Sequence, residues 1–133
     1  MNNPEQVIES AKELVCELLN KQPGKMTIRS ECPCVGGVYV IHEKDAVIYI
    51  GKAKNLRRRV YTDHLSAEVA DTMSTFRRSL NGQDQIAFGP GMRAWIVENC
   101  SFACLPVPES DMRGLVESLA IVLSRTPLLL NKE

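Results

Sequence analysis

Apolar positions at the start of the chain recur with helical spacing. Asn3 is placed to cap a helix, Pro4 suits the first helical position, and the pattern stops at Pro23-Gly24. The sequence therefore predicts an amphipathic helix within residues 1–24, with a solvated face rich in Glu and Lys. Its apolar face follows the i, i+1, i+4, i+7, i+8 pattern and consists of Val7, Ile8, Ala11, Leu14, Val15, Leu18 and Leu19.

Two short runs of β-branched and aromatic residues follow, VYVIH at 38–42 and VIYIG at 47–51, on either side of a polar turn. They predict a β-hairpin. Opposite residues of an antiparallel pair share a face and have a constant number sum. With a three-residue loop, Glu43-Lys44-Asp45, Tyr39 would face Tyr49 directly, whereas a two-residue loop would place them on opposite faces. A site shared by both tyrosines therefore requires an odd loop.

The rest of the pattern alternates helices with one more strand. We expect a helix from Asn55, a second amphipathic helix over 69–80, a strand at 94–97 (AWIV) and a loop marked by Pro106 and Pro108. The inner stripe of a final helix consists of Met112, Leu115, Val116, Leu119, Ala120 and Leu123. Together these elements predict an α+β domain, in which helices flank a small three-stranded, mostly antiparallel sheet.

Composition is typical of one globular domain, with 133 residues, 44% apolar and 24% charged. No apolar run reaches the roughly 18–20 residues that a membrane span needs. The chain starts without the basic and apolar segments of a secretory signal, and its five cysteines are then typical of free thiols in a reducing cytoplasm. The 16 basic and 16 acidic residues cancel, which by itself disfavours nucleic-acid binding.

Local charge changes that picture. The N-terminal helix is acidic, with Glu5, Glu9, Glu13 and Glu17 against Lys12, while residues 51–60 contain no acid and carry Lys52, Lys54, Arg57, Arg58 and Arg59. The neutrality is an average over separated regions, so nucleic acid is not excluded. It does predict weak non-specific affinity, assisted by a partner or a special DNA structure.

The arginines of the basic stretch face different ways on a helix. Leu56, Arg59, Val60, Asp63 and His64 share one face. Because the two apolar members must pack on the sheet, Arg59 is carried inward, whereas Arg57 and Arg58 are expected to meet phosphates or solvent. The planar guanidinium of Arg59 matches phosphate oxygens, and we prefer this interpretation to a surface ion pair one turn away.

The stretch from 36 to 59, GGVYVIHEKDAVIYIGKAKNLRRR, resembles the GIY-YIG nuclease family, especially the N-terminal module of the UvrC type. The matching residues are Gly37-Val38-Tyr39 for GIY and Tyr49-Ile50-Gly51 for YIG, then Lys52 and Arg59, and near the end Glu117 in LVESL and Asn131 in PLLLN. The resemblance extends from Gly36 to Asn131. It implies a nuclease domain over 25–133, with 1–24 as an accessory helix of one compact domain.

The resemblance implies a metal-dependent endonuclease that hydrolyses DNA phosphodiesters, with RNA not excluded and DNA repair as a setting. Tyr39 would act as general base or relay on the attacking water. A free phenol titrates at about 10, so a cation must favour the phenolate, and Lys52 is the expected one. Arg59 would stabilise the transition state, and Tyr49 would position a phosphate or water. Glu117 would bind one Mg²⁺ or Mn²⁺.

The expected nucleic-acid contacts are Gly51, Lys54, Asn55, Arg57, Arg58 and Asn131, where the glycine permits close approach and the last asparagine buttresses the site. The family often has His or Tyr one turn after the catalytic Arg, where this chain has Asp63, and His64 is the candidate replacement. Two alternatives therefore stay open. One is a nucleic-acid-binding module that has lost turnover. The other is an interaction protein whose N-terminal helix docks a partner or a second copy.

The cysteines allow a separate reading. Cys32 with Cys34, and Cys100 with Cys104, would supply four thiolates to zinc if the two pairs were adjacent in space. Neither pair has the usual two-residue separation, so buried or loop thiols are the default expectation.

Overall fold

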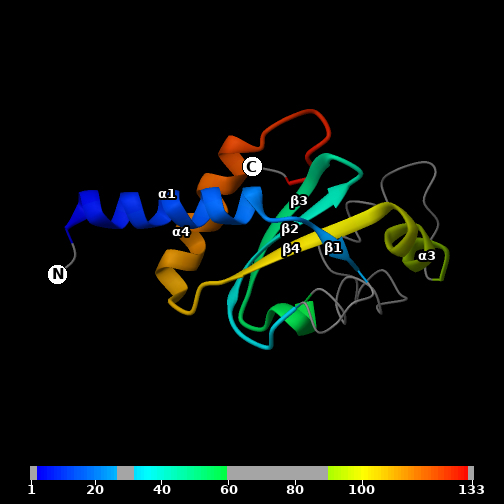
Figure 1. Cartoon of the computed structure of the whole chain (residues 1–133), viewed down its shortest axis with the longest axis horizontal. Coiled ribbons are helices and arrows are strands. Elements are labelled where there is room, and N and C mark those ends of the chain that lie inside the picture. Colours follow the sequence, from blue (N-terminus) through cyan, green and yellow to red (C-terminus); the bar gives the residue numbers. More distant parts are fainter. Residues whose placement is uncertain (1–2, 27–31, 60–89, 132–133) are drawn as a thin grey trace.

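The computed structural model describes residues 3–26, 32–59 and 90–131 (Figure 1). Its elements are α1 (Pro4–Asn20), β1 (Gly24–Lys25), β2 (Gly37–Glu43), β3 (Ala46–Ala53), α3 (Pro90–Asn99), β4 (Cys100–Pro106) and α4 (Ser110–Leu123). The strands pair antiparallel in the order β1-β4-β2-β3. The predicted α+β class with flanking helices is confirmed, but the sheet has four strands rather than three because the short β1 joins its edge.

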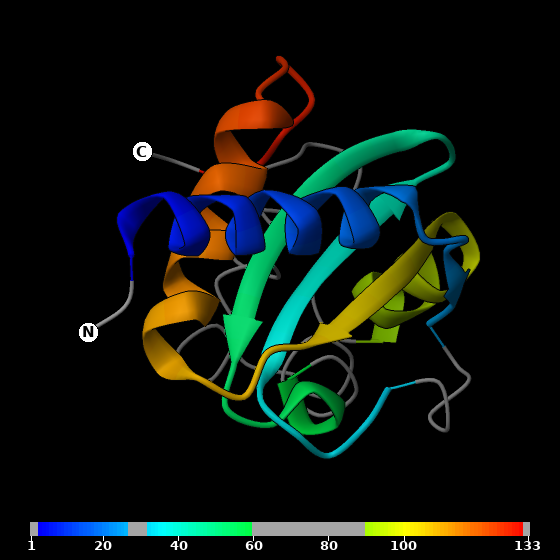
Figure 2. The same ribbon diagram turned by 60° about the vertical axis from the view of Figure 1, so that its left-hand side comes forward.

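Helix α1 forms where the apolar pattern predicts it. The Asn3 side-chain oxygen accepts the backbone N–H of Glu5 at 2.8 Å, and Pro4 occupies the first turn. Leu18 is fully buried, whereas Ile8 at the edge of the stripe is 63% exposed. The helix ends at Asn20, before Pro23. It crosses one face of the sheet, on the side that α4 also covers (Figure 2).

The sheet is buried on both faces. We call the side packed against α1 and α4 the helix-covered face, and the strand residues buried there are Val38, Val40, Ile50, Ala103 and Leu105. We call the opposite side the tyrosine face, where the core includes Tyr39, Ile41, Ile48, Tyr49, Ala53, Phe102, Cys100 and Cys104, together with Leu56 and with Ile96 of α3. Alternate residues of the same strands therefore serve two cores.

The predicted third strand is wrong in position. Residues 94–97 lie in α3, which begins at Pro90, a residue favoured in the first turn of a helix. The strand that fills this place is β4, whose residues on both faces are buried from Phe102 to Leu105. A strand buried on both sides lacks apolar-polar alternation, and for that reason the pattern of β4 was not distinctive. Pro106, expected in a loop, is the last residue of the strand.

The two hairpin tyrosines share a face, as predicted, but the structural reason differs from the one expected. The loop has two residues, Lys44-Asp45, so the odd loop that we expected is wrong; Lys44 has a φ of 56°. Ile48 is an extra residue in β3, a β-bulge that restores the parity lost at the loop. Next to the loop Glu43 pairs with Ala46 and His42 with Val47, whereas beyond the bulge Ile41 pairs with Tyr49 and Tyr39 with Gly51. Both tyrosines therefore point to one face.

Several predictions concern residues that the structure does not describe. The second amphipathic helix over 69–80 lies outside the described residues, as do Val60, Asp63 and His64. Leu56, at the start of the predicted basic helix, is described and fully buried. Among the described residues, no helix has both the length and the apolar character that crossing a membrane requires.

Candidate functional site

The two motif tyrosines lie side by side on the tyrosine face. Their ring centroids are 6.3 Å apart with the planes inclined at 31°, and the side chains are 2% and 8% exposed for Tyr39 and Tyr49. Tyr39 packs across Gly51, where any Cβ would collide with the phenol oxygen. Gly51 therefore makes room for Tyr39, a contact that the sequence interpretation of this glycine did not include.

A pocket lined mainly by basic side chains opens at the end of β3. It has a volume of about 460 Å³, and we call it the cation pocket; its lining is Lys52, Ala53, Lys54, Asn55, Arg58, Arg59, Ser110 and Arg113. Five of these eight residues are basic, and none of the described lining residues is acidic. A cleft lined by one sign of charge concentrates the electrostatic field and attracts anions. The five lining residues named from sequence, from Lys52 to Arg59, are thus brought together.

Local hydrogen bonds hold the turn that carries the arginines. The side-chain oxygen of Asn55 accepts the backbone N–H of Arg58 at 3.0 Å, as a helix cap does. The two preceding backbone N–H groups donate to the segment before β2. The Leu56 N–H donates to the Val35 carbonyl at 2.9 Å, and the Arg57 N–H donates to the Pro33 carbonyl at 3.1 Å. The turn is therefore anchored to residues 32–35 while Arg58 and Arg59 line the pocket.

Arg57 takes a different direction from its two neighbours. Its Nε donates to the Cys32 carbonyl at 2.7 Å, and Arg57 is not among the residues that line the cation pocket. The structure thus gives Arg57 a contact within the fold, and its predicted role in nucleic-acid binding stays a prediction.

Arg113 is a pocket residue that sequence reasoning missed. It lies in the first turn of α4, where its Nε donates to the Val107 carbonyl at 3.0 Å and its Nη2 to the Pro108 carbonyl at 2.9 Å. The guanidinium also covers Gly36, because a Cβ there would be 2.7 Å from Nη2. Two of the five N–H donors of the guanidinium hold the loop, so the group is oriented before any ligand arrives. Only the packing of α4 brings it to the basic stretch, and no sequence motif marks it.

Glu117 lies on α4 beside Lys52. Burial raises the pKa of the Glu117 carboxyl, while the charge of Lys52 and a hydrogen bond from the Lys52 backbone N–H act in the opposite direction. The Lys52 ammonium also lies 3.5 Å from where a Cβ on Gly114 would be. Because Lys52 pairs with Val38 in register, its side chain is on the helix-covered face, away from Tyr39.

The candidate metal ligands among the described residues meet the needs of a divalent cation only in part. Glu117 offers one half-buried carboxylate, and the described residues contain no cluster of three or more His, Cys, Asp or Glu residues able to hold a metal ion. That statement covers the cysteines singled out for zinc, of which Cys32, Cys100 and Cys104 are buried and Cys34 is exposed. A single carboxylate fits Mg²⁺, which keeps several waters and takes substrate phosphate oxygens as further ligands.

Asn131 binds the outer edge of β3. Its side chain accepts the Ile50 N–H at 2.8 Å and donates to the Ile50 carbonyl at 2.7 Å, and the Leu130 N–H bonds the Ile48 carbonyl at 2.7 Å. The C-terminal segment thus satisfies backbone groups that an edge strand would otherwise expose. Because Ile50 lies between Tyr49 and Gly51, this pairing positions the strand that carries the second motif.

Comparison with known proteins supports the resemblance seen in the sequence. Residues 21–85 match the profile of the family described as the GIY-YIG catalytic domain. The similar solved structures include the N-terminal GIY-YIG endonuclease domain of UvrC from Thermotoga maritima, as a tyrosine-to-phenylalanine point mutant bound to its catalytic divalent cation. It is 20% identical and covers 98% of this chain and 100% of that chain, with a TM-score of 0.47.

The same Thermotoga maritima domain bound to magnesium is 23% identical, covers 93% of this chain and 98% of that chain, and has a TM-score of 0.45. None of the curated proteins matches the chain. The resemblance to the GIY-YIG family that the motifs predicted is therefore confirmed at the level of the domain profile.

Proposed function

We propose that this chain, whose residues 21–85 match the GIY-YIG catalytic domain, is a metal-dependent endonuclease that hydrolyses phosphodiester bonds in DNA. One observation carries the proposal. The cation pocket gathers five basic side chains at the end of β3, directly after the Tyr49-Ile50-Gly51 motif and beside the carboxylate of Glu117. The pocket provides the positive charge that phosphodiester binding and hydrolysis both require.

Binding rests on the cation pocket. Arg58 and Arg59 present planar guanidinium groups that match phosphate oxygens, and Lys52 and Lys54 add point charges. Asn55 caps the arginine turn and lines the same pocket, so it holds the two arginines in place. We assign Arg59 to the charge that develops on the phosphoryl oxygens, because it is half-buried and Arg58 is exposed.

The tyrosines supply the proton chemistry. We assign Tyr39 as general base or relay for the attacking water and Tyr49 as the group that positions a water or phosphate, in support of which their rings lie 6.3 Å apart. Lys52 lies on the helix-covered face, so its predicted direct support of a Tyr39 phenolate is replaced in this proposal by the joint positive charge of the pocket. His64, which lies outside the described residues, keeps its predicted proton-handling role in this proposal.

Glu117 would hold the metal ion, Mg²⁺ or Mn²⁺, with the Lys52 backbone N–H orienting the carboxylate. When bound, the ion neutralises charge on the phosphoryl oxygens. Gly51 keeps Tyr39 against β3, and Asn131 holds the outer edge of the same strand. These two residues position the site rather than touch the reacting atoms.

A second candidate function is a DNA-binding module without turnover, in which the cation pocket still binds phosphates. The observation that favours it is the burial of Tyr39, which is only 2% exposed. Asp63 at the position where the family often has His or Tyr adds to it. Either candidate function is compatible with a protein partner that binds α1. The solvated side of that helix presents four exposed glutamates to such a partner.

Supercoiled plasmid incubated with the purified chain and Mg²⁺ or Mn²⁺ tests the proposal. Tyr39→Phe removes the base and is expected to lower the cleavage rate by about 10²–10⁴-fold. Arg59→Ala, which removes charge stabilisation, is expected to lower it by about 10²–10³-fold. Glu117→Gln is expected to abolish the response to added metal.

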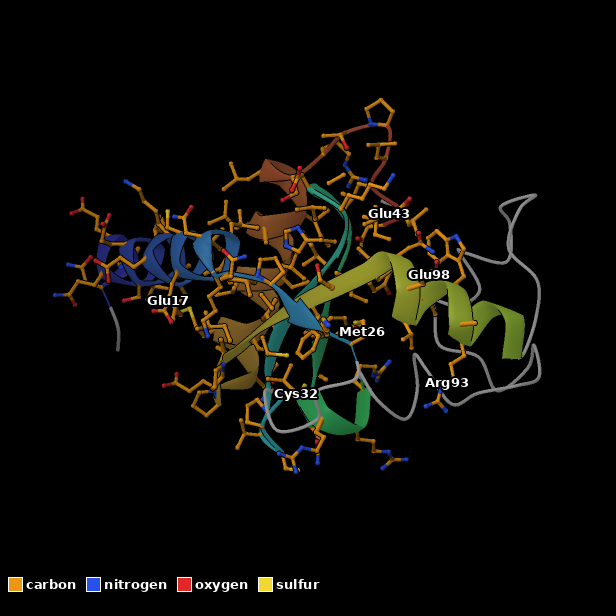
Figure 3. The ribbon with its side chains drawn as sticks, turned by 45° about the vertical axis from the view of Figure 1, so that its right-hand side comes forward. Glu17, Met26, Cys32, Glu43, Arg93 and Glu98 are labelled. Carbon is orange, nitrogen blue, oxygen red and sulfur yellow. The ribbon has the colours of Figure 1, made fainter. Side chains whose placement is uncertain are left out.

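Arg93→Ala is the matched control for Arg59→Ala, because Arg93 is exposed on α3 (Figure 3) and does not line the cation pocket. It should cleave as the unmodified chain does. Cleavage that survives both Tyr39→Phe and Arg59→Ala contradicts the nuclease proposal. Binding that weakens with salt, without any cleavage by the unmodified chain, favours the second candidate.

A further inference from the structure

Two buried thiols from distant parts of the chain are in contact. The sulfur atoms of Cys32 and Cys104 are 3.2 Å apart, although the residues are 72 positions apart in sequence. Cys32 precedes β2, and Cys104 lies within β4, where it pairs with Tyr39. Figure 3 shows Cys32 inside the fold, in the core of the tyrosine face that also includes Met26.

The surroundings make the two thiols unequal. The hydrogen bond with the Cys104 thiol lowers the pKa of Cys32; burial opposes this effect, and the positive charge of Arg57 adds to it. The pKa of Cys104 is raised by the same hydrogen bond and by burial. Cys32 is therefore the thiol that ionises more readily, and Cys104 lies in contact with it.

We propose that Cys32 and Cys104 are a redox-active pair that a peroxide oxidises to an intramolecular disulfide. The Cys32 thiolate attacks one oxygen of hydrogen peroxide, the O–O bond breaks, and a sulfenic acid forms with release of water once the leaving hydroxide takes a proton. The Cys104 sulfur then attacks the Cys32 sulfur and expels a second water. Two thiols and one peroxide thus become one disulfide and two waters, with two electrons passed to the peroxide.

The other cysteines are not placed for this reaction. Cys16 and Cys34 are exposed, and in the described part of the chain neither has a sulfur in contact. Cys100 lies four residues before Cys104 in the same strand, but burial and the charge of Glu43 raise its pKa to about 12, which keeps it a thiol. Hydrogen peroxide is small and uncharged, so burial of the reactive pair is a lesser barrier to it than to a bulky disulfide.

The disulfide would tie β4 to the segment that anchors the arginine turn. That segment accepts three hydrogen bonds from the turn, at the carbonyls of Val35, Pro33 and Cys32. A bond from Cys32 to β4 would therefore restrain the start of the turn that places Arg58 and Arg59 in the cation pocket. The proposal concerns the fold around the pocket and does not depend on nuclease activity.

Peptide mapping of the full chain after treatment with hydrogen peroxide tests the inference. We expect loss of two hydrogen atoms from the intact mass, a cross-linked peptide joining Cys32 to Cys104, and reversal by dithiothreitol. Closing a loop of this length also predicts a melting temperature higher by about 5 °C or more in the oxidised protein. Oxidation confined to Cys16 or Cys34, or a cross-link between two chains, overturns it.

Cys104→Ala is expected to leave Cys32 as a sulfenic acid that dimedone traps, with no cross-link and no rise in melting temperature. Cys100→Ala is the matched control, because it removes a buried thiol from the same strand and should still form the cross-link. If Cys104→Ala fails to fold, the cross-linked peptide of the unmodified chain decides by itself, and its absence at full consumption of free thiols contradicts the proposal.

Discussion

The two faces of the sheet differ in what their side chains do. The helix-covered face is packed with Val, Ile, Ala and Leu against α1 and α4, and its charged residues, such as Lys52, lie at the end of a strand. The tyrosine face holds both motif tyrosines and the contacting thiols, together with Leu56 from the arginine turn. Alternate residues of β2 and β3 thus face two different cores, with both motif tyrosines in one core and Lys52 at the edge of the other.

The cation pocket lies where the two faces meet. Lys52 comes from the helix-covered face, Ala53 from the tyrosine face, and Arg113 from the first turn of α4. Opposite charge is kept on the solvated side of α1, where Glu5, Glu9, Glu13 and Glu17 are all exposed. The zero net charge of the chain therefore conceals an acidic surface on α1 and the basic lining of the cation pocket.

The largest expected effect comes from the helix-covered face. Leu18→Ala in α1 removes a fully buried side chain, and we expect it to lower the free energy of unfolding by about 2–5 kcal/mol. Chemical denaturation followed by circular dichroism measures the loss. Ile8→Ala is the matched control in the same helix, since its side chain is 63% exposed, and should change stability by less than about 0.5 kcal/mol. Equal losses in the two variants would show that α1 does not pack as described.

A smaller effect is expected on the tyrosine face. Gly51→Ala adds a methyl group that collides with the Tyr39 phenol, and overpacking of this kind costs about 1–3 kcal/mol. The free energy of unfolding from denaturant titration reports it. Gly114→Ala is the control, because an added Cβ there would lie 3.5 Å from the Lys52 Nζ, an ordinary contact with the end of a flexible side chain. The higher helix propensity of alanine should stabilise this variant by about 0.5–1 kcal/mol. Wild-type stability of Gly51→Ala would mean that Tyr39 does not lie across Gly51.

The smallest effect is a dependence on pH that belongs to the helix-covered face. His42 follows Val38 and Val40 on that side of β2, and burial lowers its pKa while the charge of Asp45 partly opposes the shift. Between the folded pKa and the unfolded value of about 6.5, the unfolded chain binds the proton and the folded chain does not. Stability should therefore fall as pH drops below that unfolded value.

Denaturant midpoints measured from pH 7.5 down to pH 5, at roughly half-unit intervals, detect this loss. His42→Gln carries no titrating group and should show a shallower decline over the same range. Parallel curves for the two proteins would mean that His42 is not desolvated in the folded state.

The elements that could be predicted are those whose signal is local. The cap and most of the apolar stripe of α1 and the β-branched runs of the hairpin each depend on neighbours within a few residues. The final helix also forms as predicted, but its inner stripe was wrong at Leu115 and Leu123, which are 39% and 62% exposed, whereas Val116 and Ala120 are buried. Strand β4 lacked such a signal, because burial on both faces removes alternation, and AWIV reads as a strand although it lies in α3. Tyr39 and Tyr49 share a face because of a bulge at Ile48, and no property of the loop residues indicates that bulge.

The candidate site divides in the same way. The GIY-YIG motifs and the basic run from Lys52 to Arg59 are continuous in sequence, so the sequence alone determined the family resemblance, the tyrosine pair and most of the cations. Only the tertiary structure decided that Arg113 completes the cation pocket, that Lys52 lies beside Glu117 rather than Tyr39, and that Cys32 meets Cys104. The physical reason is that these contacts join segments distant in sequence, and the packing of α4 and β4 against the hairpin sets their geometry.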